Sequence, residues 1–244
     1  MRILVLQHAS VEHPGIFREF FRDDGFTWDT AELDAGEPIP ALEPYDFMLV
    51  MGGPQDVWQE AEHPWLATEK TAIKRFVLDM RRPFLGVCLG HQLLAEAVGG
   101  RVTLAATAEV GVLAVEKTAA GQCDALLAGT PNPMQVLQWH GAEVVALPDR
   151  TTLLASSAAC PIQAFRFEDH AYGLQFHVEI TRATVAEWAE IPAYACSLSD
   201  AMGPGAVERL KTEVGSLLPA FNRDARVLYD NLKAVIAASC GACN

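Results

Sequence analysis

The stretch Pro83-Phe-Leu-Gly-Val-Cys88-Leu-Gly-His-Gln-Leu-Leu94 decides the fold that we predict for this chain. Pro83 to Val87 is a short apolar run typical of a buried strand, and Leu89 to Val98 shows helical spacing before Gly99-Gly100 ends it. Cys88 therefore stands at a strand-to-helix turn, in the pattern Gly-x-Cys-x-Gly. Such an elbow holds a nucleophile in a strained position, and the partial positive charge of the helix start favours the reactive thiolate.

The rest of the first half alternates strand and helix patterns, which is typical of parallel βαβ units. Apolar runs at Ile3–Leu6 and Phe47–Met51 predict strands, and Gly15 to Arg22 and Pro64 to Met80 predict helices. From Val102 to about His177 the texture changes to short β-rich stretches between turn residues, so we expect an antiparallel or mixed extension of the sheet. These stretches are Val112–Val115, Gln135–Trp139, Ile162–Phe167 and Tyr172–Phe176.

Composition narrows the classes of function. The chain has 244 residues, a formal net charge of −13 and 50% hydrophobic residues, which suits a well-packed globular protein. An acidic balance without Lys/Arg clusters argues against binding to nucleic acid or to an anionic membrane. The apolar run at the N-terminus is too short for a signal peptide, and we predict a cytoplasmic protein.

The cysteines other than Cys88 suggest no chemistry. Without an export signal, the six cysteines are expected to be thiols rather than a disulfide framework. Cys240 and Cys243 form a C-x-x-C pair, but no second pair and no nearby histidines complete a metal shell. We expect no metal and no cofactor.

Three motifs in order along the chain together indicate a family. Gly86-Val-Cys88-Leu-Gly-His-Gln92, with Gly52-Gly-Pro54 before it and Leu174-Gln-Phe-His177-Val-Glu179 after it, resembles the class I glutamine amidotransferase family, whose triad is Cys-His-Glu. The resemblance is to free-standing members similar to the glutaminase of GMP synthase. It implies an α/β, flavodoxin-like class I glutamine amidotransferase fold, with a central, mostly parallel sheet flanked by helices and a small antiparallel extension. It covers residues 1–189 as catalytic domain and leaves 190–244 as a helical C-terminal extension packed on the core.

The resemblance implies a role for each catalytic residue, and each role makes chemical sense. Cys88 would attack the γ-carboxamide carbon of glutamine and form a γ-glutamyl thioester with loss of ammonia. His177 would move the protons, because imidazole titrates near working pH. Glu179 stands two residues on, so along an extended segment its side chain would point the same way as His177 and orient the imidazole.

The remaining candidate residues are predicted to contact the substrate. The resemblance points to the backbone N–H groups of Gly53 and Leu89 as the oxyanion hole, and to Gln92 as a substrate-holding residue. Trp139 and Gly141 belong to a segment similar to the one whose main chain recognises the α-amino and α-carboxyl groups. His140 in the same segment has no carboxylate two residues later and is therefore not the predicted base.

Two departures leave the substrate open. Val178 replaces a common proline, and Glu109-Val-Gly-Val112 lacks an aromatic residue that is common in the family. The tail after Ala189 has no glycine-rich phosphate loop, so we expect any ammonia-accepting synthase to be a separate protein. The first hypothesis is hydrolysis of the glutamine amide. The alternatives are hydrolysis of a γ-glutamyl peptide or amine, a non-catalytic regulatory module, and a redox-sensing thiol.

Overall fold

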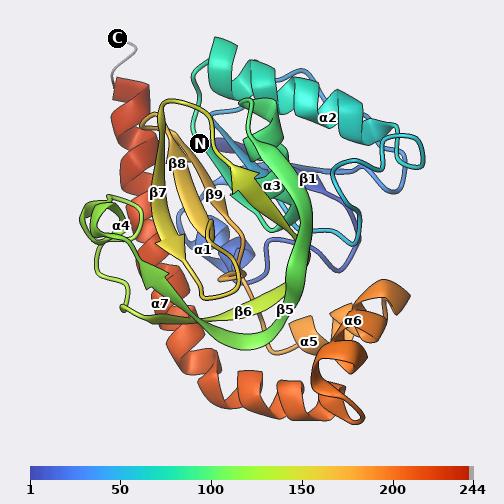
Figure 1. Cartoon of the computed structure of the whole chain (residues 1–244). Coiled ribbons are helices and arrows are strands. Elements are labelled where there is room, and N and C mark those ends of the chain that lie inside the picture. Colours follow the sequence, from blue (N-terminus) through green and yellow to red (C-terminus); the bar gives the residue numbers. More distant parts are fainter. Residues whose placement is uncertain (242–244) are drawn as a thin grey trace.

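In the computed structural model, which describes residues 1–241, nine strands form a sheet in the order β2-β1-β3-β4-β9-β8-β7-β5-β6 (Figure 1). The strands are β1 Arg2–Gln7, β2 Thr27–Glu32, β3 Phe47–Val50, β4 Phe84–Val87, β5 Arg101–Lys117, β6 Met134–Ala146, β7 Thr151–Ser156, β8 Ala164–Phe167 and β9 Ala171–Leu174. The helices are α1 Phe17–Asp23, α2 Trp65–Lys74 with a π-helical turn η1 Arg75–Asp79, α3 Leu89–Ala97, α4 Ala119–Cys123, α5 Thr184–Trp188, α6 Pro192–Met202 and α7 Ala206–Gly241.

The sheet has a parallel and an antiparallel half. β2, β1, β3, β4 and β9 are parallel neighbours, whereas β9, β8, β7, β5 and β6 pair antiparallel. The predicted α/β class is confirmed, and so is the antiparallel extension. The extension is larger than we predicted, because β5 has 17 residues and β6 has 13. The carboxyl ends of the parallel strands meet at one edge, where the loops after β1, β3, β4 and β9 gather.

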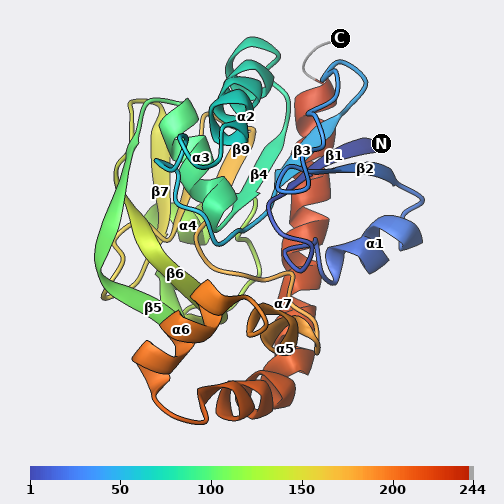
Figure 2. The same cartoon turned by 90° about the vertical axis from the view of Figure 1, so that its right-hand side faces the viewer.

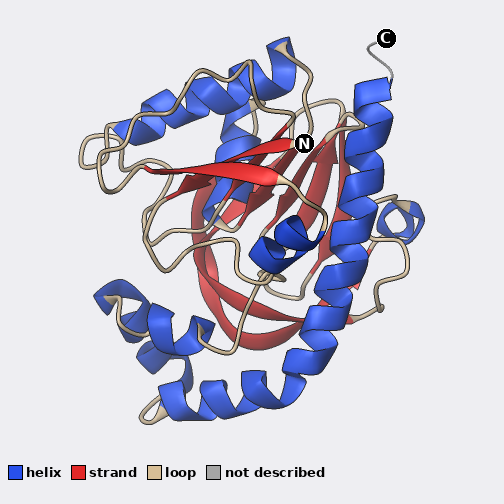
Figure 3. Ribbon diagram, turned by 180° about the vertical axis from the view of Figure 1, so that it is seen from behind, coloured by secondary structure: helices blue, strands red, loops and turns tan. Residues whose placement is uncertain are grey.

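Helices cover both faces of the parallel half. Side chains of β1 alternate between the faces, so Ile3 and Val5 join one hydrophobic cluster and Leu4 and Leu6 join the other. The first cluster is closed by α1 and α7, and the second by α2 and α3 (Figures 1 and 3). Both faces are therefore apolar, as the continuous apolar runs of the strands predict.

The elements expected in the first half are present, with one addition. The helix predicted from Gly15 begins at Phe17, and the helix predicted over Pro64 to Met80 is α2 continued by η1. β2 was missed. It is an edge strand, and only Ala31 is fully buried in it, so its sequence carries no apolar run that would mark it.

The C-terminal helices form a third hydrophobic cluster with the middle of β5 and of β6. Val110, Leu137 and Trp139 from these strands pack with residues of α5, α6 and the first part of α7. Figure 2 shows α6 beside β5 and β6. The helical spacing after Gly205 belongs to one 36-residue helix that contains Pro219. A proline inside a helix removes one hydrogen bond and bends it, which accounts for the change of direction of α7 in Figure 1.

Three further predictions, on the domain division, the location and the C-x-x-C pair, remain untested. Residues 203–205 separate α6 from α7, and the division into residues 1–189 and 190–244 stays a proposal. Within residues 1–241, none of the helices combines the length and apolar character that a bilayer span requires. The cytoplasmic location therefore stays a prediction. Cys243 of the C-x-x-C pair, and the side chain of Cys240, lie outside the described residues.

Candidate active site

Cys88 occupies the strained turn that the sequence pattern predicts. It follows β4 and caps α3, with backbone angles φ 52° and ψ −104° in a region that L-residues avoid. The flanking glycines are required by space: a Cβ on Gly86 would lie 2.2 Å from the Gly90 carbonyl oxygen, and one on Gly90 would lie 2.2 Å from that of Val50. The turn therefore presents the thiol at the carboxyl edge of the sheet.

The thiol is buried among polar groups. Cys88 is 5% exposed, and its N–H donates to the Leu174 carbonyl at 2.8 Å, which extends the pairing of β4 with β9. Its Sγ lies 3.9 Å from the Trp139 carbonyl oxygen and accepts a hydrogen bond from the Gln175 amide at 3.7 Å. Gln175, which no local pattern marks as a site residue, is fully buried and stands two residues before His177.

His177 and Glu179 lie together beside the thiol. The His177 Nδ1 is 2.7 Å from Glu179 Oε1, so the two side chains do point the same way. The other carboxylate oxygen accepts the Val178 N–H at 2.9 Å, and the His177 N–H donates to the Leu137 carbonyl. Burial disfavours the imidazolium, but the charge of Glu179 and hydrogen bonds with Cys88 and Glu179 outweigh it, and the pKa of His177 lies well above its ordinary value.

The loop after β3 and the start of α3 supply unpaired backbone donors. Among the described residues, neither the Gly53 N–H nor the Leu89 N–H has an acceptor. Both residues line the same pocket as Cys88. The loop is fixed to α3, because the Gly90 N–H donates to the Met51 carbonyl at 3.1 Å. The arrangement is suited to binding an oxygen that gains negative charge.

The pocket has a volume of about 160 Å³ and is lined by several separate parts of the chain, including Ala108 of β5. The loop after β3 and the start of α3 form one side, the middle of β6 forms another, and α6 closes it. Its lining includes Gly53, Pro54, Gln55, Asp56, Cys88, Leu89, Gln92, Ala108, Trp139, His140, Gly141, Ala142, Ala193, Tyr194 and Ser197. The wall from α6 was not foreseen from the sequence.

The predicted substrate contacts differ in what they can offer. Gln92 uses its side-chain amide hydrogens on the Ala142 carbonyl and the Gln175 side chain, both at 3.1 Å, which leaves its oxygen for a ligand. The indole of Trp139 is core, since its Nε1 donates to Ser197 and its ring packs on Trp188, so only its main chain can serve the pocket. Gly141 lines the pocket with its backbone.

A second buried carboxylate lies next to the predicted triad. Glu12 is 1% exposed, and its Oε1 accepts the Tyr194 hydroxyl at 2.6 Å. A Cβ on Gly52 would lie 2.6 Å from the other oxygen and 3.1 Å from the His177 ring, so only glycine fits between them. Burial raises the pKa of Glu12, against the opposing charge of His177. Glu12 and Tyr194 stand 182 positions apart, and no local pattern marks either.

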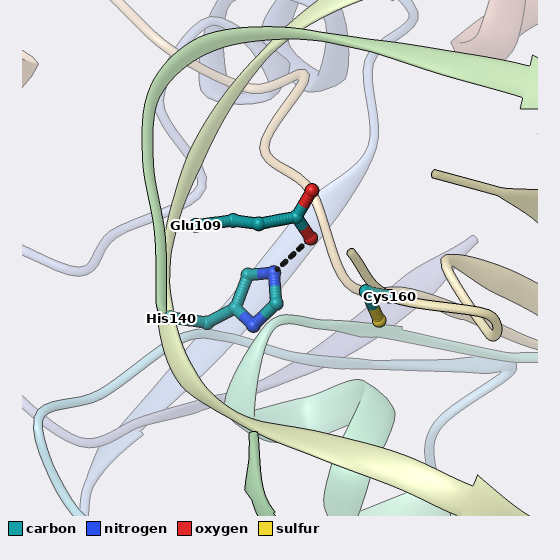
Figure 4. A group of neighbouring side chains, drawn as sticks. All are labelled: Glu109, His140 and Cys160. Atoms are coloured by element: carbon teal, nitrogen blue, oxygen red, sulfur yellow. Dashed lines mark hydrogen bonds and ion pairs between the residues drawn. The ribbon is translucent and has the colours of Figure 1, made fainter. Parts of the chain in front are cut away.

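Glu109, His140 and Cys160 form the group of side chains drawn in Figure 4. The Glu109 carboxylate accepts hydrogen bonds from Ser157 and Gln163 at 2.7 Å and lies 3.2 Å from His140 Nε2. Burial raises the pKa of the Cys160 thiol to about 12, and its Sγ donates to the Ile162 carbonyl at 3.6 Å. These residues form a hydrogen-bonded group beside the pocket. His140 uses both ring nitrogens on Ala142 and Glu109 and therefore does not bond the Cys88 thiol.

Comparison with known proteins places the chain in a family. The family model for glutamine amidotransferase class-I matches residues 24–186. The chain belongs to this family. Class I glutamine amidotransferases of known structure share its fold: a glutamine amidotransferase from Thermotoga maritima superposes with a TM-score of 0.84 at 29% identity, covering 95% of this chain and 97% of that one.

Proteins similar in sequence to this chain carry the names of several different activities. The glutamine amidotransferase-like protein YfeJ of Salmonella typhimurium is 34% identical over 74% of this chain and 77% of its own length. One of the subunits of the glutamine-hydrolyzing GMP synthase of Sulfurisphaera tokodaii is 34% identical over 59% of this chain and 72% of its own. Gamma-glutamyl peptidase 3 of Arabidopsis thaliana is 29% identical over 70% of each.

Proposed function

We propose that the protein hydrolyses the γ-carboxamide of glutamine to glutamate and ammonia through a γ-glutamyl thioester on Cys88. The observation that carries the proposal is a strained cysteine that shares one pocket with two unpaired N–H groups, with the buried His177–Glu179 pair beside its thiol. Each group has the chemistry that one step of acyl transfer needs.

Acylation begins with the transfer of the thiol proton to His177. The Sγ attacks the γ-carbon, and the carbonyl oxygen becomes an oxyanion that the Gly53 and Leu89 N–H groups stabilise. His177 then gives its proton to the amide nitrogen, the C–N bond breaks, and ammonia leaves. Glu179 holds the imidazole by Nδ1 at 2.7 Å, so Nε2 is the nitrogen left to exchange protons with the thiol.

Deacylation reverses the roles with water. His177 takes a proton from a water molecule, the hydroxyl attacks the thioester carbon, and the same two N–H groups stabilise the second oxyanion. The C–S bond breaks, and the proton held by His177 restores the thiol. The net reaction consumes glutamine and water and yields glutamate and ammonia.

Hydrolysis of a γ-glutamyl peptide is the second candidate. The triad and the oxyanion donors would be the same, and only the leaving amine would differ. The resemblance to a protein named gamma-glutamyl peptidase favours it, whereas the wall formed by Ala193, Tyr194 and Ser197 of α6 limits the room for a large leaving group. Glutamine is therefore the first substrate to test.

The decisive experiment measures release of glutamate and ammonia by the purified chain. We expect glutamine to be turned over and γ-glutamyl dipeptides to have a lower kcat/KM. Cys88→Ala should abolish both activities, since the nucleophile is lost. Cys160→Ala is the matched control, because Cys160 is also buried but lies outside the pocket. Activity that survives Cys88→Ala would refute the mechanism, and a preference for the dipeptides would favour the second candidate.

An ammonia-accepting partner is part of the proposal. The likeness to a protein named as one of the subunits of GMP synthase supports a separate synthase protein that accepts the ammonia. Such a partner would receive ammonia before it is protonated in water. Pull-down with the tagged chain, followed by an assay of glutamine turnover in the recovered material, tests this. Turnover above that of the purified chain supports a partner. Recovery of the chain alone, with the turnover of the purified chain, contradicts it.

A further inference from the structure

A further histidine–glutamate pair lies behind the loop that carries the proposed oxyanion donor. His8 follows β1, Glu69 lies on α2, and both side chains are fully buried. The His8 Nε2 is 2.9 Å and 3.1 Å from the two carboxylate oxygens of Glu69. The ring also stacks on Trp65 at 5.3 Å between centroids. The proposed chemistry uses neither His8 nor Glu69, although burying a charged pair costs stability unless it is well paired.

The other ring nitrogen of His8 reaches the oxyanion loop. His8 Nδ1 lies 2.8 Å from the Gly52 carbonyl oxygen, and a Cβ on Gly53 would lie 2.7 Å from the His8 Cβ. The Gly52 carbonyl belongs to the same peptide unit as the Gly53 N–H. In a planar trans peptide these two groups point in opposite directions, so a donor on the carbonyl fixes the direction of the N–H.

The partners of His8 decide where its protons are. A carbonyl oxygen can only accept, so Nδ1 must donate to Gly52. Nε2 faces a carboxylate, so a proton is shared between this nitrogen and Glu69. Burial disfavours the charged ring, yet the charge and the hydrogen bond of Glu69 raise the pKa of His8 above its ordinary value. The hydrogen bond to Gly52 is then charge-assisted, and such bonds are stronger than neutral ones.

We propose that His8 and Glu69 are positioning residues for the oxyanion hole: the His8 ring, held by Glu69, donates to the Gly52 carbonyl and thereby aims and polarises the Gly53 N–H. A peptide whose carbonyl accepts a strong hydrogen bond is a better donor through its own N–H, because hydrogen bonds in a chain reinforce one another. The inference rests on the proposed function for its kinetic effect, whereas the polarised peptide can be detected without turnover.

Two variants separate the parts of this arrangement. Glu69→Gln keeps the shape but removes the charge, so His8 keeps a neutral N–H for Gly52. The double variant His8→Leu/Glu69→Leu removes the donor without leaving a buried charge unpaired. We expect kcat with glutamine to fall about 10-fold in the double variant and less in Glu69→Gln, since deleting an oxyanion donor outright costs about 10²–10³-fold. KM should change by less than about twofold, because the interaction strengthens only as charge develops.

Two readouts separate this role from a merely structural one. Alkylation of Cys88 by iodoacetamide forms no oxyanion, so its rate should be unchanged in both variants. The Gly53 amide proton should resonate downfield in the native protein and move upfield in the double variant. His170→Leu is the matched control, because His170 is also buried and bonds a backbone carbonyl, that of Val77. It lies at the amino ends of β4 and β9, away from the carboxyl ends where the pocket is. Its kcat should remain native.

The outcomes are distinct. An unchanged kcat in the double variant, or an equal fall of kcat and of the alkylation rate, would overturn the proposal. An unchanged Gly53 amide resonance would overturn it as well. A native chain that turns over neither glutamine nor γ-glutamyl dipeptides would refute the proposed function instead, and the amide resonance would still decide whether His8 polarises the Gly53 peptide.

Discussion

At the scale of residues, short contacts with neighbouring side chains, rather than the net charge of −13, determine the electrostatics of the buried carboxylates near the thiol. Glu179 faces His177 across 2.7 Å, and Glu69 faces His8 across 2.9 Å, so both of these buried carboxylates have an imidazole partner. Glu12 differs, because it accepts from the Tyr194 hydroxyl and its other oxygen has no partner among the described residues. The neighbourhood of the thiol thus contains several buried titratable groups, as functional sites often do.

Replacing Glu179 by glutamine should change the titration of His177. The charge of Glu179 raises the pKa of His177, whereas burial lowers it, so the variant should show a lower pKa. NMR titration of the His177 ring measures this directly. Glu187→Gln is a matched control, because Glu187 is half exposed and lies near His13 instead.

The same change alters how stability depends on pH. A raised pKa in the folded state contributes stability that is complete below the unfolded value of 6.5 and is lost as pH rises through the folded value. The difference in unfolding free energy between native protein and Glu179→Gln should therefore shrink as pH rises above 6.5. A difference that grows with pH would contradict the assigned direction.

At the scale of elements, the turn from β4 to α3 depends on a close crossing of two backbones. The Gly90 N–H donates to the Met51 carbonyl, and the Val50 carbonyl fills the space that a side chain at position 90 would need. The loop after β3 and the start of α3 are therefore held in register, which fixes Gly53 relative to Cys88. This coupling explains why small residues stand on both elements.

Gly90→Ala should damage both stability and activity. Its new methyl group would lie 2.2 Å from a backbone oxygen, and overpacking of this kind costs about 1–3 kcal/mol. Gly215→Ala is the matched control: it lies inside α7 with open space at its Cβ position, and helix propensity predicts a gain of about 0.5–1 kcal/mol. Chemical denaturation measures both, and equal effects of the two variants would contradict the packing argument.

The sequence predicts the elements whose signals are local. The strand, turn and helix around Cys88 follow from an apolar run, two glycines and helical spacing. The contact between His177 and Glu179 follows from their spacing of two residues along an extended segment. β2 carries no such signal, because an edge strand half exposed to water needs no apolar run. Family resemblance, rather than periodicity, suggested Gly53 and Leu89.

The parts that escaped prediction are contacts between distant segments. Tyr194 reaches Glu12 and lines the pocket only because α6 folds back over β5, and His8 meets Glu69 because α2 covers β1. No spacing along the chain encodes such pairs. Trp139 shows the same limit, since the sequence could not tell that its ring is core while its main chain lines the pocket.

At the scale of the whole molecule, α7 joins the C-terminal segment to the parallel half of the sheet. Tyr229 is 1% exposed and its ring lies 5.2–6.0 Å from those of Phe17, Phe20 and Phe21. Its hydroxyl donates to Asp24 at 2.6 Å. This packing supports the proposed description of residues 190–244 as an extension of the core rather than an independent unit.

Tyr229→Ala should therefore destabilise the whole protein. Truncating a large buried aromatic side chain costs about 3–5 kcal/mol, whereas Tyr229→Phe, which removes only the hydroxyl, should cost about 1 kcal/mol. We expect a single unfolding transition, lowered in both variants, by calorimetry. A separate low-temperature transition of α7 in Tyr229→Ala, with the rest unchanged, would show that the extension folds on its own.

The proposed reaction cleaves glutamine through a covalent γ-glutamyl intermediate on Cys88. Its most direct measurement is rapid acid quench of the protein during turnover of glutamine, followed by peptide mass spectrometry. We expect a γ-glutamyl adduct on the peptide that contains Cys88, absent in Cys88→Ala and sensitive to hydroxylamine, as a thioester is. Steady release of glutamate and ammonia with no adduct on Cys88 at any quench time, or an adduct on another residue, would contradict it.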